Sequence, residues 1–427
     1  MILITLIFLV LLLIGMPLGF AIGIAGFTFF VTDPNFPASI SAQRIISSTQ
    51  SFPLLAVPLF VLAGHLMNAT GITRRLLVFA SALTGWMAGG LAHTSIVLSA
   101  LMGGISGSSV ADASMEARIL GPTMRRHGYA GGFTAAVIAL SSLITSTIPP
   151  SIGLILYGFI GQVSVGRLFV AGVVPGILMT AILMGPTYLI SRRRGYRGEL
   201  DAPPGWREVL RAMNDAKYAL VFPVWLIVGI RFGLFTPSEA GAFAVVYALL
   251  VGFFAHRELE VSELPGLLGR AVTDIGMIML ILMLSAMLGF AIIVEQVPQN
   301  MAAFIAGLSE NPVMVLFLLL GFLVIAGMFV ESTVMVLLLT PILVPIVRQL
   351  GIDDVHFGIL MVILVGLGSM TPPVGVIMYT VCGLLNVKTD QYVRESLPFI
   401  LSILVLLTIL ALFPDLVLFL PRLVYGS

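Results

Sequence analysis

The chain has 427 residues, of which 59% are hydrophobic and only 10% are charged, and its 21 basic and 20 acidic residues give a net charge of +1. A soluble domain carries about 25% charged residues, so the mean hydropathy of +1.12 excludes that class. The near-zero net charge excludes a nucleic-acid binder that relies on a basic surface, and the single cysteine excludes an internal disulfide. We predict an all-α protein that crosses a membrane several times.

The N-terminal segment, residues 1–32, carries no charge. A secretory signal needs a basic region before its apolar core, whereas a helix of about 20 apolar residues crosses a bilayer. We therefore expect this segment to be a retained transmembrane helix. Further apolar runs follow at residues 54–68, 77–101, 131–158, 169–191, 218–235, 240–255, 272–294, 313–344, 356–384 and 397–420.

Two stretches, residues 103–153 and 327–375, are interrupted by Gly, Pro and Ser. Irregular backbone is tolerated in lipid only where it is buried in protein or lines a cavity. A shift of 223 positions places Gly104 on Gly327, Ser109 on Ser332, Pro122 on Pro345, Arg125 on Arg348, Gly128 on Gly351, Ser146 on Ser369, and Pro149-Pro150 on Pro372-Pro373. Such an internal repeat with interrupted segments at equivalent positions indicates the binding site of a secondary transporter.

The charge distribution orients the two copies. Residues 191–217 hold seven basic residues against four acids, so the positive-inside rule places this loop in the cytoplasm. Counting crossings from this loop puts Arg125 on the cytoplasmic side. If residues 313–344 form a re-entrant hairpin, Arg348 lies on the opposite side, and the repeats are inverted.

Each copy contains a polar tip and, about 40 residues later, a broken helix. The tips are residues 103–112 and 327–333, and the breaks are residues 146–151 and 366–373. Double proline removes backbone donors and prevents a regular helix just before it. The freed carbonyl oxygens, together with Ser and Thr hydroxyls, suit a sodium ion. The N-termini of half-helices supply partial positive charge for an anionic substrate.

Two acids stand out in these segments, because an ionisable group inside a membrane run is functional by default. Ser108 and Asp112 are four residues apart, on one face of a helix. Alternatively, Asp112 belongs to the scaffold and pairs with Arg118 or with the Arg125-Arg126 cluster. Glu331 has no basic residue within sixteen positions. His65 and His93 are expected to be hydrogen-bonded packing residues.

One enzyme reading also fits a short motif. Gly104-Ile105-Ser106-Gly107 matches the GxSG of rhomboid-type intramembrane serine proteases. That chemistry needs a histidine base on a later membrane helix, and the three later histidines fall in expected loop segments. An intramembrane serine protease is therefore a remote alternative, and we expect the protein not to be an enzyme.

The polar tips, the two double prolines and the Gly327–Pro345 segment together resemble the large membrane subunit of TRAP (tripartite ATP-independent periplasmic) transporters, a family of the ion-transporter superfamily that includes sialic acid transporters. The resemblance covers essentially the whole chain. It implies an elevator-type transporter whose transport domain has two re-entrant hairpins and two broken helices. The corresponding regions are 1–100 (scaffold helices and arm), 101–168 (first hairpin and broken helix), 169–294 (scaffold helices with the basic loop 191–217), 295–390 (second hairpin and broken helix) and 391–427 (C-terminal membrane helix).

The resemblance also implies the site residues. Sodium, the coupling ion, would bind in the first copy at Gly103, Ser106, Ser109, Ser146 and Thr147, and in the second at Gly327, Ser332, Gly366, Ser369 and Thr371. The substrate would contact Ser108, Asp112, Ser151 and Glu331. No organic cofactor is implied.

The implied partners are a small four-helix membrane subunit, which we expect to be a separate chain, and a soluble periplasmic substrate-binding protein. The resemblance places this chain in the bacterial inner (cytoplasmic) membrane, as a multi-pass protein. The carboxylates of Asp112 and Glu331 would repel a dicarboxylate, whereas the hydroxyls of a sugar acid could donate hydrogen bonds to them. We therefore favour sialic acid over a C4-dicarboxylate. Outside this family, the alternative is a stand-alone sodium/proton antiporter or ion channel, with a continuous pore or a paired-acid proton site.

Overall fold

The computed structural model describes residues 2–50, 52–200, 202–297, 299–301 and 311–426, and over these residues the chain forms helices and no strand. The helices of the first half are α1 (Ile2–Leu13), α2 (Leu18–Thr32), α3 (Ser39–Thr49), α4 (Ala56–Ala69), α5 (Ile72–Thr84), α6 (Gly90–Gly103), α7 (Ser109–Arg126), α8 (Gly131–Thr147), α9 (Ile152–Gly161) and α10 (Val165–Arg194). Those of the second half are α11 (Trp206–Asp215), α12 (Lys217–Arg231), α13 (Pro237–Leu250), α14 (Leu264–Val294), α16 (Pro312–Gly327), α17 (Ser332–Gln349), α18 (Asp354–Gly368), α19 (Val376–Leu385), α20 (Thr389–Leu412) and α21 (Asp415–Tyr425). Short turns of 3₁₀ or π-helix cover Phe52–Leu55, Val251–Ala255 and Val261–Glu263.

Several of these helices can cross a membrane, as the composition predicts. Among the described residues, five helices are long and apolar enough, or up to eight spans if each sharply bent pair counts as one. The bent pairs are α4 with α5, α8 with α9, and α11 with α12, at 70°, 44° and 65°. The prediction of an all-α protein with several membrane spans is therefore confirmed.

The prediction of one N-terminal membrane helix is wrong in detail. The segment forms two helices, α1 and α2, which are separated at residues 14–17. Gly15 adopts a φ of +80°, and Pro17 has no N–H to continue a helix. These two residues interrupt an otherwise apolar run, which hydropathy alone reads as continuous.

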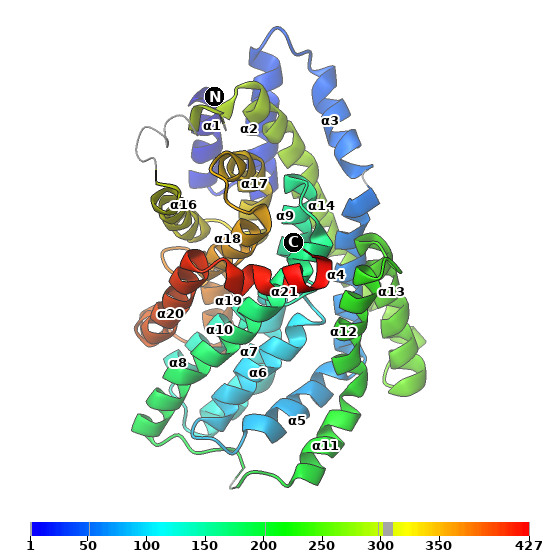
Figure 1. Ribbon diagram of the computed structural model, residues 1–427, viewed down its shortest axis with the longest axis vertical. Coiled ribbons are helices and arrows are strands. Elements are labelled where there is room, and N and C mark those ends of the chain that lie inside the picture. The colour runs from blue at the N-terminus through cyan, green and yellow to red at the C-terminus, as the bar shows by residue number, and fades with distance from the viewer. Residues whose placement is uncertain (1, 51, 201, 298, 302–310, 427) are drawn as a thin grey trace.

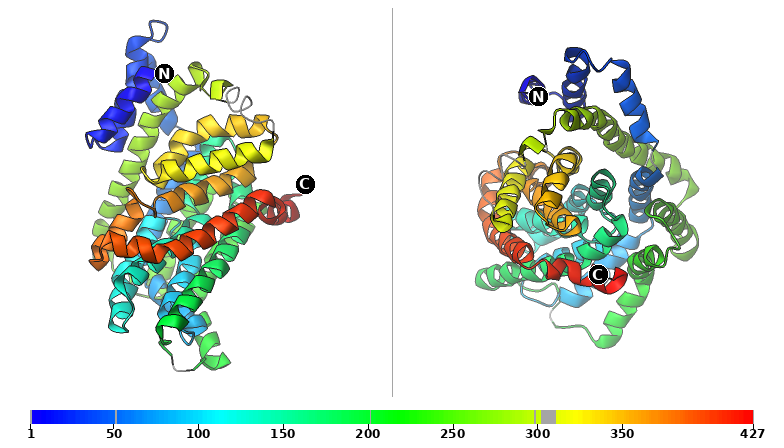
Figure 2. Two further views of the ribbon diagram at one scale, coloured as in Figure 1. Left: turned by 90° about the vertical axis from the view of Figure 1, so that its left-hand side faces the viewer. Right: turned by 45° about the horizontal axis from the view of Figure 1, so that its top comes forward.

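The two most deeply buried helices are α8 and α18, which pack against each other. Every described residue of α18 except Asp354 is buried, and α8 is buried over nearly its whole length. A helix that is apolar all round belongs in the interior. The helix α8 packs against α6, α7, α10, α19 and α20 as well, and α18 packs against α16 and α17, which lie beside it in yellow to orange in Figure 2. The segment that follows α8, residues 148–151, is also largely buried, whereas Pro372, Pro373 and Val374 in the segment that follows α18 are exposed.

The outer helices expose apolar faces. Val31 on α2, Val224 on α12 and Val272 on α14 are each more than 60% exposed, as lipid-facing side chains would be. The helices α2 and α3 pack along α14, and α1 packs against α2, at one end of the molecule (Figure 1). The opposite end carries α5, α11 and the end of α10, and thus the basic loop between α10 and α12 (Figure 1).

Two arginines tie the interrupted segments together in matching ways. Arg125, at the end of α7, donates to the carbonyl of Leu385 at the end of α19, with an N–O distance of 2.8 Å. Arg348, at the end of α17, donates to the carbonyl of Gly161 at the end of α9, at 2.9 Å. In each case an arginine satisfies the otherwise unpaired carbonyls of a helix C-terminus.

Candidate functional site

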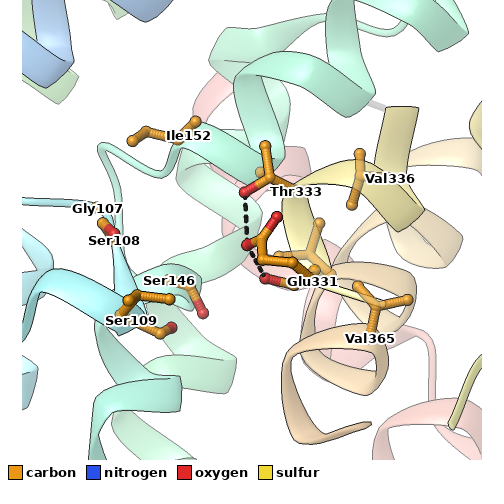
Figure 3. A pocket seen from close by; sticks show the side chains of 13 residues that line it. Gly107, Ser108, Ser109, Ser146, Ile152, Glu331, Thr333, Val336 and Val365 are labelled. Carbon is orange, nitrogen blue, oxygen red and sulfur yellow. Dashed lines mark hydrogen bonds between the residues drawn. The ribbon is translucent and has the colours of Figure 1, made fainter. Parts of the chain in front are cut away.

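The two polar tips and the first helix break meet around a small cavity of about 40 Å³. It is lined by Gly107, Ser108, Ser109, Val110, Ser146, Ile152, Gly153, Glu331, Ser332, Thr333, Val336, Val362 and Val365. Figure 3 shows Glu331 facing Ser108, Ser109 and Ser146 across this space. Segments at least 178 residues apart in the sequence, from Gly153 to Glu331, thus share one site.

The first tip owes its shape to Gly107 and Ser108. Gly107 has a φ of +61°, a conformation that favours glycine, and a Cβ there would overlap the carbonyl oxygen of Pro150. Ser108 is the N-cap of α7, because its Oγ accepts from the backbone N–H of Ala111 at 3.4 Å. The tip therefore packs directly onto the double-proline break.

The second tip is capped by an acid. Glu331 is the N-cap of α17 and accepts from the Val334 N–H at 3.2 Å. Its carboxylate also accepts from the hydroxyls of Ser332 and Thr333, at 3.0 and 2.9 Å (Figure 3). A negative charge at a helix N-terminus is favourable, so the fold stabilises Glu331 without a basic partner.

A second, larger cavity of about 500 Å³ adjoins the small one. Ser108, Val110, Ile152, Glu331 and Thr333 line both. The wall opposite the tips comes from α4 and α14. The small cavity has room for an ion or a few waters, whereas the large one lies in the size range of ligand pockets, about 300–1,000 Å³.

Helix ends of both kinds converge here. The N-termini of α7, α9 and α17 border the small cavity, as does Ser146 in the last turn of α8, and the first residue of α19, Val376, lines the large one. N-terminal N–H groups favour an anion, and the carbonyls at helix C-terminal ends favour a cation. The arrangement can therefore hold an anion and a cation side by side.

The residues predicted for sodium are dispersed around this centre. Ser109, Ser146 and Ser332 line the small cavity, and Ser106 lines the large one. The remaining six are buried and line neither cavity: Gly103, Thr147, Gly327, Gly366, Ser369 and Thr371. Gly327 packs against the backbone of Val365 and Gly368, and a Cβ on Gly366 would lie 3.8 Å from the Ser146 Oγ. These contacts bring the two predicted clusters next to each other.

The four residues predicted for substrate divide into two pairs. Ser108 and Glu331 line both cavities. Asp112 and Ser151 are buried, at 1% and 0% exposure, and line neither cavity. Asp112 accepts from the Thr145 hydroxyl at 2.6 Å, and Ser151 donates to the Ser146 carbonyl at 2.5 Å. Among the described residues, Asp112 forms no ion pair with Arg118, Arg125 or Arg126.

Sequence reasoning missed two polar groups. Glu116, one turn after Asp112 on α7, is fully buried and accepts from the hydroxyls of Ser95 and Ser99 on α6. Its position four residues after Asp112 was the available signal. The other is Asp274 on α14, which lies 2.8 Å from the Nε2 of His65 on α4; His65 is hydrogen-bonded, as expected, but this partner was not foreseen. No sequence signal joins residues 209 positions apart.

Comparisons with known proteins agree with this architecture. A sequence profile of the family described as "Tripartite ATP-independent periplasmic transporter, DctM component" matches residues 5–416. The "Sialic acid TRAP transporter large permease protein SiaM" of Vibrio cholerae is 36% identical over 97% of each chain. The "C4-dicarboxylate TRAP transporter large permease protein DctM" of Pseudomonas aeruginosa is 35% identical over 94% of each.

Among solved structures, the YdaH transporter of Alcanivorax borkumensis has the same fold, with a TM-score of 0.61 over 90% of each chain at 14% identity. The relatives similar in sequence are named as permeases of transporters, which supports a transport role rather than an enzymatic one. The match over nearly the whole chain, with the interrupted helices at its centre, shows that this protein belongs to the DctM family, the large permease component of TRAP transporters.

Proposed function

We propose that the protein carries out sodium-coupled uptake of an organic acid, delivered by a periplasmic substrate-binding protein, across the bacterial inner membrane. The observation that carries this proposal is the pair of adjoining cavities. The small one accommodates an ion and the large one an organic molecule, and Ser108 and Glu331 belong to both. Occupancy of one cavity can therefore affect the other through shared residues.

Sodium is the proposed coupling ion because of oxygen atoms that have no hydrogen-bond partner. Within the described chain, the Oγ atoms of Ser106 and Ser109 and the Oδ1 of Asp112 are buried and unpaired. Leaving a buried polar atom unsatisfied costs about 1–3 kcal/mol. A bound sodium ion would satisfy such atoms, since it prefers hydroxyl, carbonyl and carboxylate oxygens.

Two relatives of almost equal identity are named for sialic acid and for C4-dicarboxylates, so similarity alone does not select the substrate. Glu331 places negative charge on the cavity wall, and a second carboxylate on the substrate would be repelled. A sugar acid has one carboxylate and many hydroxyls that can donate to Glu331. We therefore propose sialic acid as the preferred substrate.

We also propose that the interrupted segments are inverted repeats, in which α6–α7 and α16–α17 form re-entrant hairpins and the breaks follow α8 and α18. They would move together as the transport domain of an elevator. The matching contacts of Arg125 and Arg348 support this view, since each joins one repeat to the other. A separate small four-helix membrane subunit would complete the scaffold.

The test is uptake into proteoliposomes that contain both membrane subunits, with the binding protein outside. We expect uptake of N-acetylneuraminate with an inward sodium gradient and little uptake with a potassium gradient of equal size. Equally fast uptake driven by a proton gradient without sodium would refute sodium coupling. Sodium flux without any organic acid would favour the alternative of a stand-alone antiporter or channel.

A further inference from the structure

The large cavity has a polar wall that the proposed site does not use. Of its lining residues, three are ionisable: Glu331 on the hairpin side, and His65 and Asp274 on the opposite side. Asn68, one turn after His65 on α4, adds an amide to that wall. The rest of the wall that α4 and α14 contribute is apolar or glycine, including Val61, Gly64, Met277 and Ile281.

The His65–Asp274 pair is accessible from the cavity. The side chains are 26% and 47% exposed, and the Nε2 of His65 lies 2.8 Å from one carboxylate oxygen, Oδ2, of Asp274. That bond fixes the carboxyl group and leaves Oδ1 free to accept another hydrogen bond. Both residues lie on helices that pack against each other, α4 and α14, so the pair is a fixed part of one wall.

A pair of ionisable side chains inside a membrane protein is costly, and such residues mark substrate pathways by default. Packing between α4 and α14 requires neither group, because apolar residues would fill the same space at lower cost. We therefore attribute to His65 and Asp274 a function that requires polar side chains, beyond the packing of α4 against α14.

We propose that His65, Asp274 and Asn68 form a second subsite, which binds the hydroxyl groups of the transported acid on the side away from its carboxylate. This inference rests on the proposed function, because it takes the large cavity as the place of the organic acid. Asp274 accepts hydrogen bonds from hydroxyls, and its negative charge repels a carboxylate. His65 is a positioning residue that holds the Asp274 carboxyl group in place.

The two walls then orient the acid. Its carboxylate turns toward the N-termini of α7 and α9, which are capped by serine side chains and where partial positive charge collects. Its hydroxyl-bearing end turns toward Asp274. A site that hydrogen-bonds substrate hydroxyls discriminates strongly against analogues that lack them, because its buried polar groups are then left unpaired. The subsite therefore selects for hydroxylated acids.

The test compares two pairs of acids on the complete transporter in proteoliposomes: N-acetylneuraminate with its 8,9-dideoxy analogue, and malate with succinate. Only the pair that the wild-type protein transports is analysed further. Within that pair, the acid with more hydroxyl groups, N-acetylneuraminate or malate, should have the lower KM. Asp274→Asn should raise the KM for that member about tenfold or more, and change the KM of the deoxy member less than twofold. His65→Gln, which keeps a hydrogen-bond donor, should have a smaller effect than His65→Ala.

Asp215→Asn is the matched control, because Asp215 is an exposed acid at the end of α11, remote from the cavity lining. It should leave both KM values unchanged. The proposal is overturned if Asp274→Asn raises the KM of both acids equally. It is also overturned if the variant only lowers the amount of folded protein while the remainder keeps its selectivity. If wild type transports no organic acid at all, the proposed function itself fails, which is a distinct outcome.

Discussion

At the scale of single residues, the two acids of the polar tips occupy different environments. Glu331 caps α17 and faces both cavities. Asp112 lies inside the packing of α7 against α8, where it accepts from Thr145. The difference arises because Glu331 precedes its helix whereas Asp112 sits within the first turn, on the face turned to α8. Glu331 is therefore the stronger candidate for direct substrate contact.

We expect Glu331→Ala to lose most uptake, because the substrate would lose a direct contact. The substitution should lower the free energy of unfolding by only about 0.5–2 kcal/mol, the usual contribution of an N-cap. Asp353→Ala provides a control, because Asp353 caps α18 through the N–H groups of Val355 and His356 and lies outside both cavities. Both variants should show a similar decrease in the thermal-unfolding midpoint. Uptake that falls equally in both would mean that Glu331 acts only as a cap.

Gly107 offers a test of the first tip. Gly107→Ala should abolish uptake for two reasons. Alanine is strained in the left-handed backbone conformation of this position, and its Cβ would overlap the carbonyl oxygen of Pro150. Gly128 also has a positive φ, of +80°, but a Cβ there meets nothing within 4 Å. Gly128→Ala should therefore show only the backbone cost of about 1–2 kcal/mol and retain uptake. Normal uptake by Gly107→Ala would show that the tip need not pack against the break.

At the scale of helices, α6 and α7 are joined by a polar contact as well as by apolar packing. Glu116 accepts from Ser95 and Ser99, and all three side chains are fully buried. An apolar pair of faces can slide, whereas directional hydrogen bonds fix the relative position of two helices. This contact thus sets where α7 begins relative to the end of α6, and hence the position of the tip between them.

We expect Glu116→Ala to destabilise the protein by about 1–3 kcal/mol for each serine hydroxyl that loses its partner. Glu116→Gln should be milder, because its amide oxygen still accepts a hydrogen bond. The measurements are thermal unfolding in detergent and sodium-dependent uptake of the folded fraction. If Glu116→Ala unfolds at the wild-type temperature, the contact does not hold the two helices.

At the scale of the whole molecule, the elevator proposal requires that the interrupted segments move as one unit. Contacts between α7 and α19, α9 and α17, and α8 and α18 join the two copies. Contacts to the remaining helices are also present: a Cβ on Gly104 would overlap the ring of Pro223 on α12. Such a contact must separate if α12 belongs to the static scaffold.

Cysteine pairs test this in a background where the single native cysteine, Cys382, is replaced by Ala. Gly161→Cys with Val344→Cys links α9 to α17, since a Cβ on Gly161 lies 3.2 Å from Val344. That disulfide should leave uptake intact. Gly104→Cys with Pro223→Cys should stop uptake until a reductant is added. The reverse pattern would rule out the elevator proposal.

The sequence by itself determined the class of protein, the positions of the interruptions and the residues at the tips. Apolar composition admits only a membrane environment, and a double proline prevents a regular helix just before it. The family follows from the same motifs and is confirmed. Hydropathy failed at residues 14–17, because the interruption there depends on two residues within an apolar run.

Only the tertiary structure decided which polar groups face a cavity and which are enclosed. Asp112 and Ser151 lie within the packing while Ser108 and Glu331 line both cavities, although all four occupy similar positions next to helix starts. His65 and Asp274 meet only because α4 packs on α14. Periodicity and spacing act within a single helix, whereas a cavity is formed by side chains from several helices, and their relative positions follow from packing across the whole chain.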